Sequence, residues 1–240
     1  GMVSTATIVH ATPASFLAHN VSRNYFQQIA LYYASSGVDL LIGGGRKYFY
    51  KRTDRRNLIQ EMKEENYSVS DFHVEAFEEA VLDFDKKFVY FTAETDPKTV
   101  RQGRDYLPSA SRAAANFLDK RSEKGFFLMI EGAQIDWGGH NNNSEYIITE
   151  MLDFDATIGN ILKFAEEDGE TLVIVTADHE TGGYSINPGS TMEKIIAGFT
   201  SDYHTASLIP VFAYGPGSEL FGGTYENTAI YDKMKEAFGL

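Results

Sequence analysis

The sequence predicts an α/β fold in which helices cover the faces of a mainly parallel sheet. Short runs of β-branched and aromatic residues end in Gly or polar residues, and longer stretches with helical periodicity separate them. The chain has 240 residues and a hydrophobic fraction of 43%, which is enough to bury a core. Since no internal repeat or Pro-, Gly- or Ser-rich linker divides it, we expect residues 1–240 to form a single domain.

Strand candidates follow one another at intervals that leave room for helices between them. A β-favouring run begins at the first residue, and five later runs are rich in Val, Ile, Leu, Phe or Tyr. These five are residues 38–42, 88–92, 126–130, 171–176 and 208–214. A helical stretch separates 126–130 from 171–176, so we expect these two strands to be parallel and joined by a right-handed crossover. The glycines at 43–45 lack the lysine and hydroxyl spacing of a P-loop and predict a turn.

Two helices can be placed from the signals at their ends. Thr12 followed by Pro13 is typical of an N-cap with proline at the first helical position, and predicts a helix through about residue 33. Between residues 144 and 167 apolar side chains recur on one helical face, and Gly169 predicts the C-terminal end. That face comprises Ile147, Met151, Phe154, Ile158, Ile161 and Ala165.

The composition excludes several classes of protein. Thirty-four acidic residues against 21 basic ones give a net charge of −13, so the chain lacks the basic surface that binds nucleic acid as a polyanion. No apolar stretch is long enough to span a bilayer, and we expect no membrane contact. The absence of cysteine excludes disulfides, thiolate metal sites and a cysteine nucleophile. Any metal must therefore bind to His, Asp, Glu or hydroxyl groups.

Histidines and carboxylates collect near the predicted ends of strands. The segments EGAQIDWGGH, TADHETGG and DYH each contain an Asp close to a His. Alone, the adjacent Asp178 and His179 fit a buried Asp bonded to backbone amides beside a partly exposed His as well as they fit a metal site. However, the carboxyl ends of parallel strands form the ligand crevice of an open sheet, so the three segments are expected to converge. Their carboxylates and imidazoles suit zinc and exceed what one four-coordinate ion uses, which indicates two or more ions.

Four strings resemble the alkaline phosphatase family, in the same order and at similar intervals. They are HATPASFLAH with the SR that follows it, EGAQIDWGGHNNN, TADHETGG and YHTASLIPVFAYGPG. The resemblance implies a three-layer α/β/α sandwich with a mainly parallel central sheet. It also implies metal-dependent hydrolysis of phosphate monoesters through a phosphoserine intermediate, and a location in the periplasm or outside the cell. The resemblance gives no role to His19, at the end of the first string, or to His73, and we expect both to be structural or solvated.

The same resemblance implies the protein ligands of two zinc ions and one magnesium ion. They are Asp136, His140 and His204 for the first zinc, Asp178 and His179 for the second, and Thr12 and Glu131 for magnesium. Independent chemistry supports the division, because magnesium prefers oxygen donors and zinc accepts imidazole nitrogen. Paired cations of this kind stabilise both oxygens of an in-line displacement at phosphorus.

Three further residues receive roles from the resemblance. Arg23 would be the catalytic residue that clamps the phosphate group of the substrate, since a guanidinium fork matches two phosphate oxygens. Trp137, the only tryptophan, would contact the substrate, and packing at the rim of the crevice is an equally good interpretation. His10 would stand beside the magnesium ligands without binding the ion directly. The combination of His10 and Trp137 resembles one bacterial subgroup of the family, and leaves the identity of the third metal open.

The nucleophile of the family lies in an Asp-Ser-Ala type motif, and the sequence contains no Asp-Ser pair. We therefore expect this chain to be the C-terminal portion of a larger enzyme, truncated at its N-terminus and without turnover by itself. Ser4 and Thr5 lack the acidic neighbour and helix start that would make either a substitute nucleophile.

Two other functions stay open at this point. One is another enzyme of the same superfamily, namely a phosphodiesterase, a sulfatase or a phosphomutase, which has a similar metal cradle. The other is a non-catalytic metal-binding module. For the phosphatase, the expected partners are a small phosphomonoester, inorganic phosphate and a second copy of the chain in a homodimer.

Overall fold

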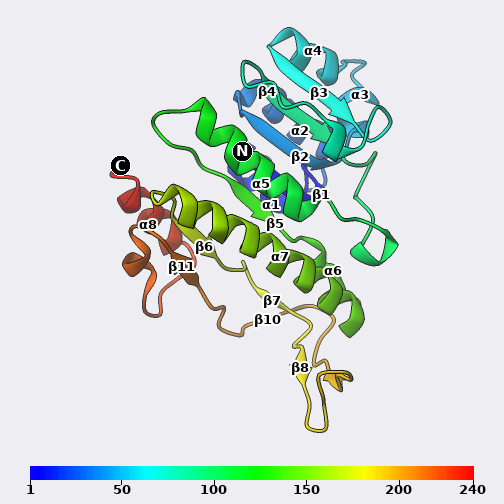
Figure 1. Cartoon of the computed structure of the whole chain (residues 1–240). Helices are drawn as coiled ribbons and strands as arrows, with labels where there is room; N and C mark the ends of the chain where they lie inside the picture. Colours follow the sequence, from blue (N-terminus) through cyan, green and yellow to red (C-terminus); the bar gives the residue numbers. More distant parts are fainter. The chain divides into compact units, whose positions relative to one another are not determined.

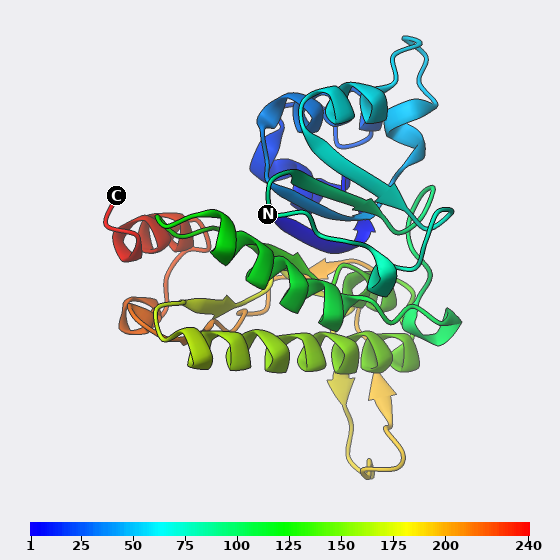
Figure 2. The ribbon, with the colours of Figure 1, turned by 45° about the horizontal axis from the view of Figure 1, so that its top comes forward.

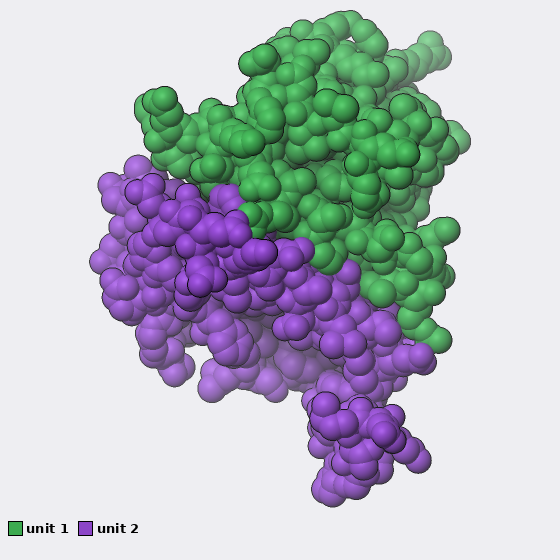
Figure 3. All heavy atoms as spheres, viewed as in Figure 1, with its two compact units in different colours: residues 1–134 green, residues 135–240 purple.

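The computed structural model describes residues 1–240 and divides them into two compact units (Figure 3). Unit 1 is Gly1–Gln134 and unit 2 is Ile135–Leu240. The single domain over residues 1–240 stays a prediction.

A five-stranded parallel sheet forms the centre of unit 1 (Figure 1). Its order is β3-β4-β2-β1-β5, and every pair of neighbours is parallel. The strands are β1 (Met2–Thr7), β2 (Leu40–Gly44), β3 (Tyr67–Asp71), β4 (Lys87–Phe91) and β5 (Met129–Glu131). The predicted α/β class with a mainly parallel sheet is confirmed. The runs at 38–42, 88–92 and 126–130 correspond to β2, β4 and β5 with shifted ends, whereas β3 was not among the candidates.

The core of unit 1 lies on this sheet because its central strands are covered on both faces. All residues of β1 and β2 are buried, which is typical of parallel strands between layers of helices. Helix α5 packs on β1 and β2, α4 packs on β3, and α1 packs on β5. The largest side chains that are fully buried there include Tyr33, Phe49, Phe88, Phe91 and Phe117.

The helix predicted from Thr12 to about residue 33 is in fact two helices. Helix α1 ends at Leu17 and α2 begins at Phe26. Between them the Ser22 amide donates to Asn20 Oδ1 at 3.3 Å, and the Asn24 amide donates to Ser22 Oγ at 3.3 Å. Such local side-chain bonds compete with helical ones and break the helix. The helices of unit 1 are α1 (Ala11–Leu17), α2 (Phe26–Ser36), α3 (Lys47–Tyr50), α4 (Leu58–Glu64) and α5 (Leu107–Arg121), with short 3₁₀ turns at Phe77–Glu79 and Val100–Gln102.

The glycines that follow Ile42 allow two backbone segments to cross closely. The Gly45 amide donates to the carbonyl oxygens of Ala93 and Thr95 at 3.1 and 2.8 Å. A Cβ atom on Gly44 would lie 2.0 Å from the Thr95 oxygen, so no larger residue fits there. Gly43 and Gly44 therefore end β2 at a close backbone crossing, and the turn begins only at Gly45. The expectation that all three glycines form a turn is wrong for the first two.

Unit 2 combines one long helix with short strands. Helix α7 ends at Gly169 in the left-handed conformation (φ 76°), as the sequence predicts. The elements are α6 (Gln134–His140), α7 (Ser144–Asp168), β6 (Val173–Val175), β7 (Glu180–Thr181), β8 (Ser185–Ile186), β9 (Ala197–Gly198), β10 (His204–Thr205), β11 (Phe212–Tyr214), a 3₁₀ turn at Ser218–Phe221 and α8 (Ala229–Ala237). Three antiparallel pairs result, β6 with β11, β7 with β10, and β8 with β9.

One sequence-based expectation for this region is wrong. Strands β5 and β6 do not share a sheet, because β5 pairs with β1 and β6 pairs with β11, so the predicted parallel crossover pairing is not formed. On α7 the predicted apolar face is only partly buried, since Met151 is 45% exposed while Ile147 and Ala165 are buried. A regular helical period cannot indicate which part of a long helix finds a packing partner.

The β8–β9 hairpin projects to one side of α7, away from the rest of unit 2 (Figure 2). Its loop carries exposed apolar side chains, and Met192 is 100% exposed. None of the helices in either unit has the length and apolar character that crossing a membrane requires.

Candidate metal centre

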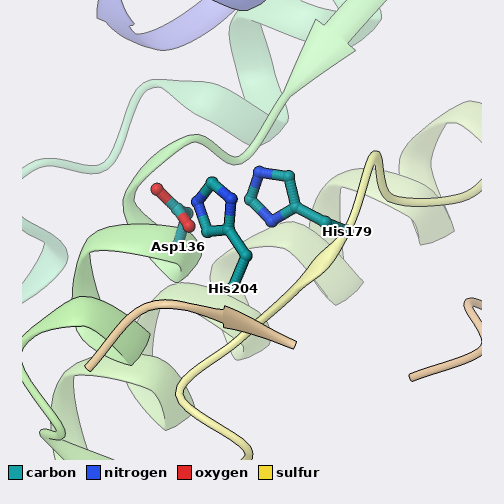
Figure 4. Close-up of side chains that lie close together, drawn as sticks. All are labelled: Asp136, His179 and His204. Atoms are coloured by element: carbon teal, nitrogen blue, oxygen red, sulfur yellow. The ribbon is translucent and has the colours of Figure 1, made fainter. Parts of the chain in front are cut away.

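Three segments that are far apart in the sequence bring a carboxylate and two imidazoles together in unit 2. Asp136 lies on α6, His179 directly precedes β7, and His204 begins β10. One ligand atom from each lies within 4.8 Å of the other two (Figure 4). The rings of His179 and His204 stack with centroids 3.5 Å apart. Imidazole nitrogens and a carboxylate oxygen are donors that fit zinc, and the cluster combines two predicted ligands of the first zinc, Asp136 and His204, with one of the second, His179.

Thr181 connects two members of this cluster through its hydroxyl group. Its Oγ1 donates to Asp136 Oδ1 at 2.5 Å and lies 3.2 Å from Nδ1 of His179. Since the single hydroxyl proton goes to the carboxylate, Nδ1 of His179 is the protonated nitrogen and donates to Thr181. This leaves Nε2 of His179 with the lone pair that a metal ligand needs.

His140 has its orientation fixed in a similar way. Its Nδ1 lies 2.8 Å from the carbonyl oxygen of Asp202, which can only accept, so Nδ1 is the donor. Its Nε2 lies 3.5 Å from Asp136 Oδ2. Asp178 contacts His179, with its Oδ2 3.2 Å from Nε2 of that ring. All five predicted zinc ligands therefore lie in or beside one cluster of unit 2.

The carboxylate of Glu180 is surrounded by donors. It accepts hydrogen bonds from the Thr205 hydroxyl and from the amides of Gly183 and Tyr184 at 3.0 and 3.2 Å. Burial disfavours the charged form, but the hydrogen bonds from Thr205, Tyr184 and Gly183 outweigh it and lower the pKa of Glu180. The side chain is therefore an anion next to the histidines.

In unit 1, Glu131 ends β5 and is held by a hydroxyl from the neighbouring strand. Ser4 on β1 is fully buried and its Oγ donates to Glu131 Oε2 at 2.6 Å. The same Ser4 oxygen accepts the Ala6 amide at 3.0 Å. Burial and, less strongly, the charge of Glu131 raise the pKa of Tyr33. Ser4 therefore connects β1 to the carboxylate at the end of β5.

The other predicted residues of unit 1 lie around α1. Thr12 is in the first turn of α1, which packs against β5, and His10 is the N-cap of this helix. Arg23 lies in the segment between α1 and α2 rather than on a helix, and its side chain is exposed. One guanidinium nitrogen of Arg23 lies 3.5 Å from Nε2 of His10. Hydroxyl and carboxylate oxygens, as on Thr12 and Glu131, are donors that fit magnesium.

Comparison with known proteins identifies the family. The family model for alkaline phosphatase matches residues 1–197. The chain belongs to the alkaline phosphatase family. Alkaline phosphatase 3 of Bacillus subtilis is 30% identical over 99% of this chain and 67% of its own length, and alkaline phosphatase 4 is 29% identical over 95% and 65%. This chain therefore spans about two thirds of these alkaline phosphatases.

Solved alkaline phosphatases have the same fold. The enzyme from the Antarctic bacterium TAB5 matches with a TM-score of 0.89 and 41% identity, over 100% of this chain and 71% of the other. A mutant of the TAB5 alkaline phosphatase with the same match has magnesium bound in its M3 site. The predicted family, α/β fold and enzyme class are confirmed.

The sequence patterns identified the candidate ligands of the cluster but not the side chains that orient these ligands. The alkaline phosphatase motifs contain Asp136, His179 and His204, and the structure brings these together. Thr181 and Glu180 are in the same TADHETGG string, yet nothing in a string of letters distinguishes a ligand from the side chain that orients it. The exposed His19 and His73 lie outside the cluster. Trp137 follows Asp136 on α6, and its contact with substrate stays a prediction.

Proposed function

We propose that this chain supplies the metal-binding and phosphate-binding residues of an enzyme that hydrolyses phosphate monoesters through a phosphoserine intermediate. The observation that carries the proposal is the cluster of Asp136, His179 and His204 in unit 2. Since the 240 residues contain no Asp-Ser pair, we assign the nucleophilic serine to a segment outside them. The substrate is a small phosphomonoester, inorganic phosphate is a product, and homodimerisation stays a prediction.

The proposed ligands divide between the two units. In unit 2, Asp136, His140 and His204 hold one zinc, and Asp178 and His179 hold a second. When bound, zinc supplies Lewis-acid stabilisation of negative charge on phosphoryl oxygens. In unit 1, Thr12 and Glu131 hold magnesium, a role supported by their oxygen donors and by the magnesium in the M3 site of the TAB5 mutant.

Several side chains act on the substrate or on the ligands. Arg23 binds two phosphate oxygens through its guanidinium fork, and its exposed position leaves this fork accessible. His10 lies beside the guanidinium and orients it. Thr181 and the carbonyl of Asp202 orient the rings of His179 and His140 through their Nδ1 atoms.

The first test measures metal content. Elemental analysis of the purified chain should find zinc, and His204→Ala should lower the zinc stoichiometry because the remaining ligands no longer complete a coordination sphere. His19→Ala is a matched control, since His19 is exposed and lies outside the cluster. An unchanged zinc content in His204→Ala would refute the proposed zinc site.

A chromogenic phosphomonoester assay with added zinc and magnesium belongs beside this measurement. Zinc binding without turnover is the expected result for the chain alone. Clear turnover would mean that a hydroxyl group or water in this chain attacks phosphorus, and would contradict the assignment of the nucleophile to another segment.

A further inference from the structure

Glu180 is a charged residue next to the metal centre, and the proposed chemistry gives it no role. It follows the proposed ligand His179 directly, yet it does not belong to the cluster of ligand atoms. Its two oxygens accept three hydrogen bonds from protein groups, from Thr205, Gly183 and Tyr184. A carboxylate engaged in this way is suited to hold backbone segments rather than to bind an ion.

The strands that present the two imidazoles are too short to hold themselves in place. Strands β7 and β10 have two residues each, and their register pairs Thr205 with Glu180 and His204 with Thr181. Two pairs of residues form few ladder bonds, and side-chain pairs across strands add to such a contact. The bond from the Thr205 hydroxyl to Glu180 is a charge-assisted pair of this kind, and it lies one residue from His179 on one strand and from His204 on the other.

The same carboxylate also closes the turn that follows β7. Gly182 and Gly183 have φ values of 92° and 58°, in the left-handed region. The Gly182 carbonyl accepts the amides of Thr200 and Ser201 at 3.0 and 3.2 Å, and the Gly182 amide donates to the Tyr203 carbonyl at 2.9 Å. By accepting the Gly183 and Tyr184 amides, Glu180 holds this turn in the conformation in which Gly182 bonds to the segment that leads into His204.

We propose that Glu180 is a positioning residue of the metal centre, which fixes β7 and its turn against β10 and so holds the imidazoles of His179 and His204 together. The proposal rests on the proposed function, because it assumes that these two histidines bind zinc. It predicts that Glu180 affects zinc affinity and ligand geometry although it touches no ion.

The test compares variants that remove either partner of the cross-strand bond. Glu180→Gln replaces one acceptor oxygen with an NH₂ group. This group can only donate, and it would face the hydroxyl and amide donors that surround the carboxylate. Thr205→Val removes the hydroxyl group, whereas Thr205→Ser keeps it. Glu193→Gln on the exposed loop between β8 and β9 is a matched control for the change of charge. Zinc affinity is measured by competition with a chromophoric chelator, and the visible spectrum of the cobalt(II)-substituted chain reports ligand geometry.

Zinc affinity should fall about 10- to 100-fold in Glu180→Gln and in Thr205→Val, as for other outer partners of metal ligands. The cobalt spectrum should change in both, and Thr205→Ser and Glu193→Gln should behave like the unchanged chain. Circular dichroism identifies variants that are folded, and if Glu180→Gln fails to fold, the two Thr205 variants decide.

Wild-type zinc affinity and cobalt spectrum in folded Glu180→Gln or Thr205→Val would overturn the proposal. A lower thermal stability with an unchanged spectrum would do the same, because it would show a purely structural role. The His204→Ala variant distinguishes failure of the positioning role of Glu180 from failure of the proposed zinc site. If His204→Ala loses zinc while the Glu180 variant keeps it, only the positioning role is wrong, and if His204→Ala also keeps zinc, the zinc site itself is wrong.

Discussion

The two units hold their candidate ligands by different means. In unit 1, Glu131 lies at the end of a strand in a five-stranded parallel sheet, and a buried serine on the neighbouring strand binds it. In unit 2, His179 and His204 lie at two-residue strands, and the side chains of Glu180, Thr181 and Thr205 supply the connections between segments. Regular backbone pairing positions Glu131, and a network of side-chain hydrogen bonds positions His179 and His204.

This difference has an energetic consequence. The sheet of unit 1 is stabilised by burial of large apolar side chains, whereas several large apolar side chains of unit 2, such as Phe212, are exposed. We therefore expect core substitutions to affect stability mainly in unit 1, and polar substitutions in unit 2 to affect the metal centre.

The largest effect is expected for Phe91→Ala. Phe91 on β4 is fully buried and its ring lies against Phe49 with centroids 5.0 Å apart. Its loss should lower the free energy of unfolding by about 3–5 kcal/mol. Phe212→Ala on β11, where the side chain is 64% exposed, should change it by no more than about 0.5 kcal/mol. Urea unfolding followed by circular dichroism measures both, and equal losses would abolish the contrast between the units.

A second prediction assigns phosphate binding to unit 1. Arg23→Ala should weaken the binding of inorganic phosphate to the zinc-loaded chain by about 1.5–3 kcal/mol, the contribution of charged hydrogen bonds. The zinc content should not change, since the proposed zinc ligands are in unit 2. Calorimetric titration with phosphate and elemental analysis provide the two readouts, and Arg55→Ala, at an exposed arginine of the same unit, is the control. A loss of zinc in Arg23→Ala would show that its role is misassigned.

The third prediction concerns the support of Glu131. Ser4→Ala removes the donor to Glu131 Oε2 and the acceptor of the Ala6 amide, and should destabilise the chain by about 1–3 kcal/mol. Ser111→Ala offers a sharp comparison, because Ser111 is also fully buried but its hydroxyl group has no hydrogen-bond partner. Its removal should be neutral or stabilising. Equal destabilisation in the two variants, measured by urea unfolding, would mean that the bond to Glu131 contributes nothing.

The sequence predicted most of the elements that depend on apolar runs. The predicted strand 88–92 begins with four consecutive apolar or aromatic residues and corresponds to β4, in which these four are buried. Strand β3 was not predicted because its sequence YSVSD has only two apolar or aromatic residues, and the Ser and Asp residues between and after them are also common in turns. The break between α1 and α2 was not predicted because it depends on which local hydrogen bonds Asn20 and Ser22 form.

At the candidate site, the ligand residues could be predicted from the sequence, but the hydrogen bonds that connect them to distant parts of the chain could not. Asp136, His179 and His204 could be selected because metal ligands come from few residue types and the family motifs contain them. The roles of Ser4 and Thr181 depend on contacts across 127 and 45 positions of the chain, which no local pattern encodes. The pairing of β6 with β11, instead of a parallel neighbour, likewise depends on non-local packing.

The β8–β9 hairpin has a practical consequence for labelling. The chain contains no cysteine, and Met192 is fully exposed on the loop of this hairpin. A cysteine introduced at that position would be the only thiol in the chain, on an exposed loop that accepts change readily. A fluorophore or a surface tether could thus be attached at one defined point without altering any of the proposed ligands.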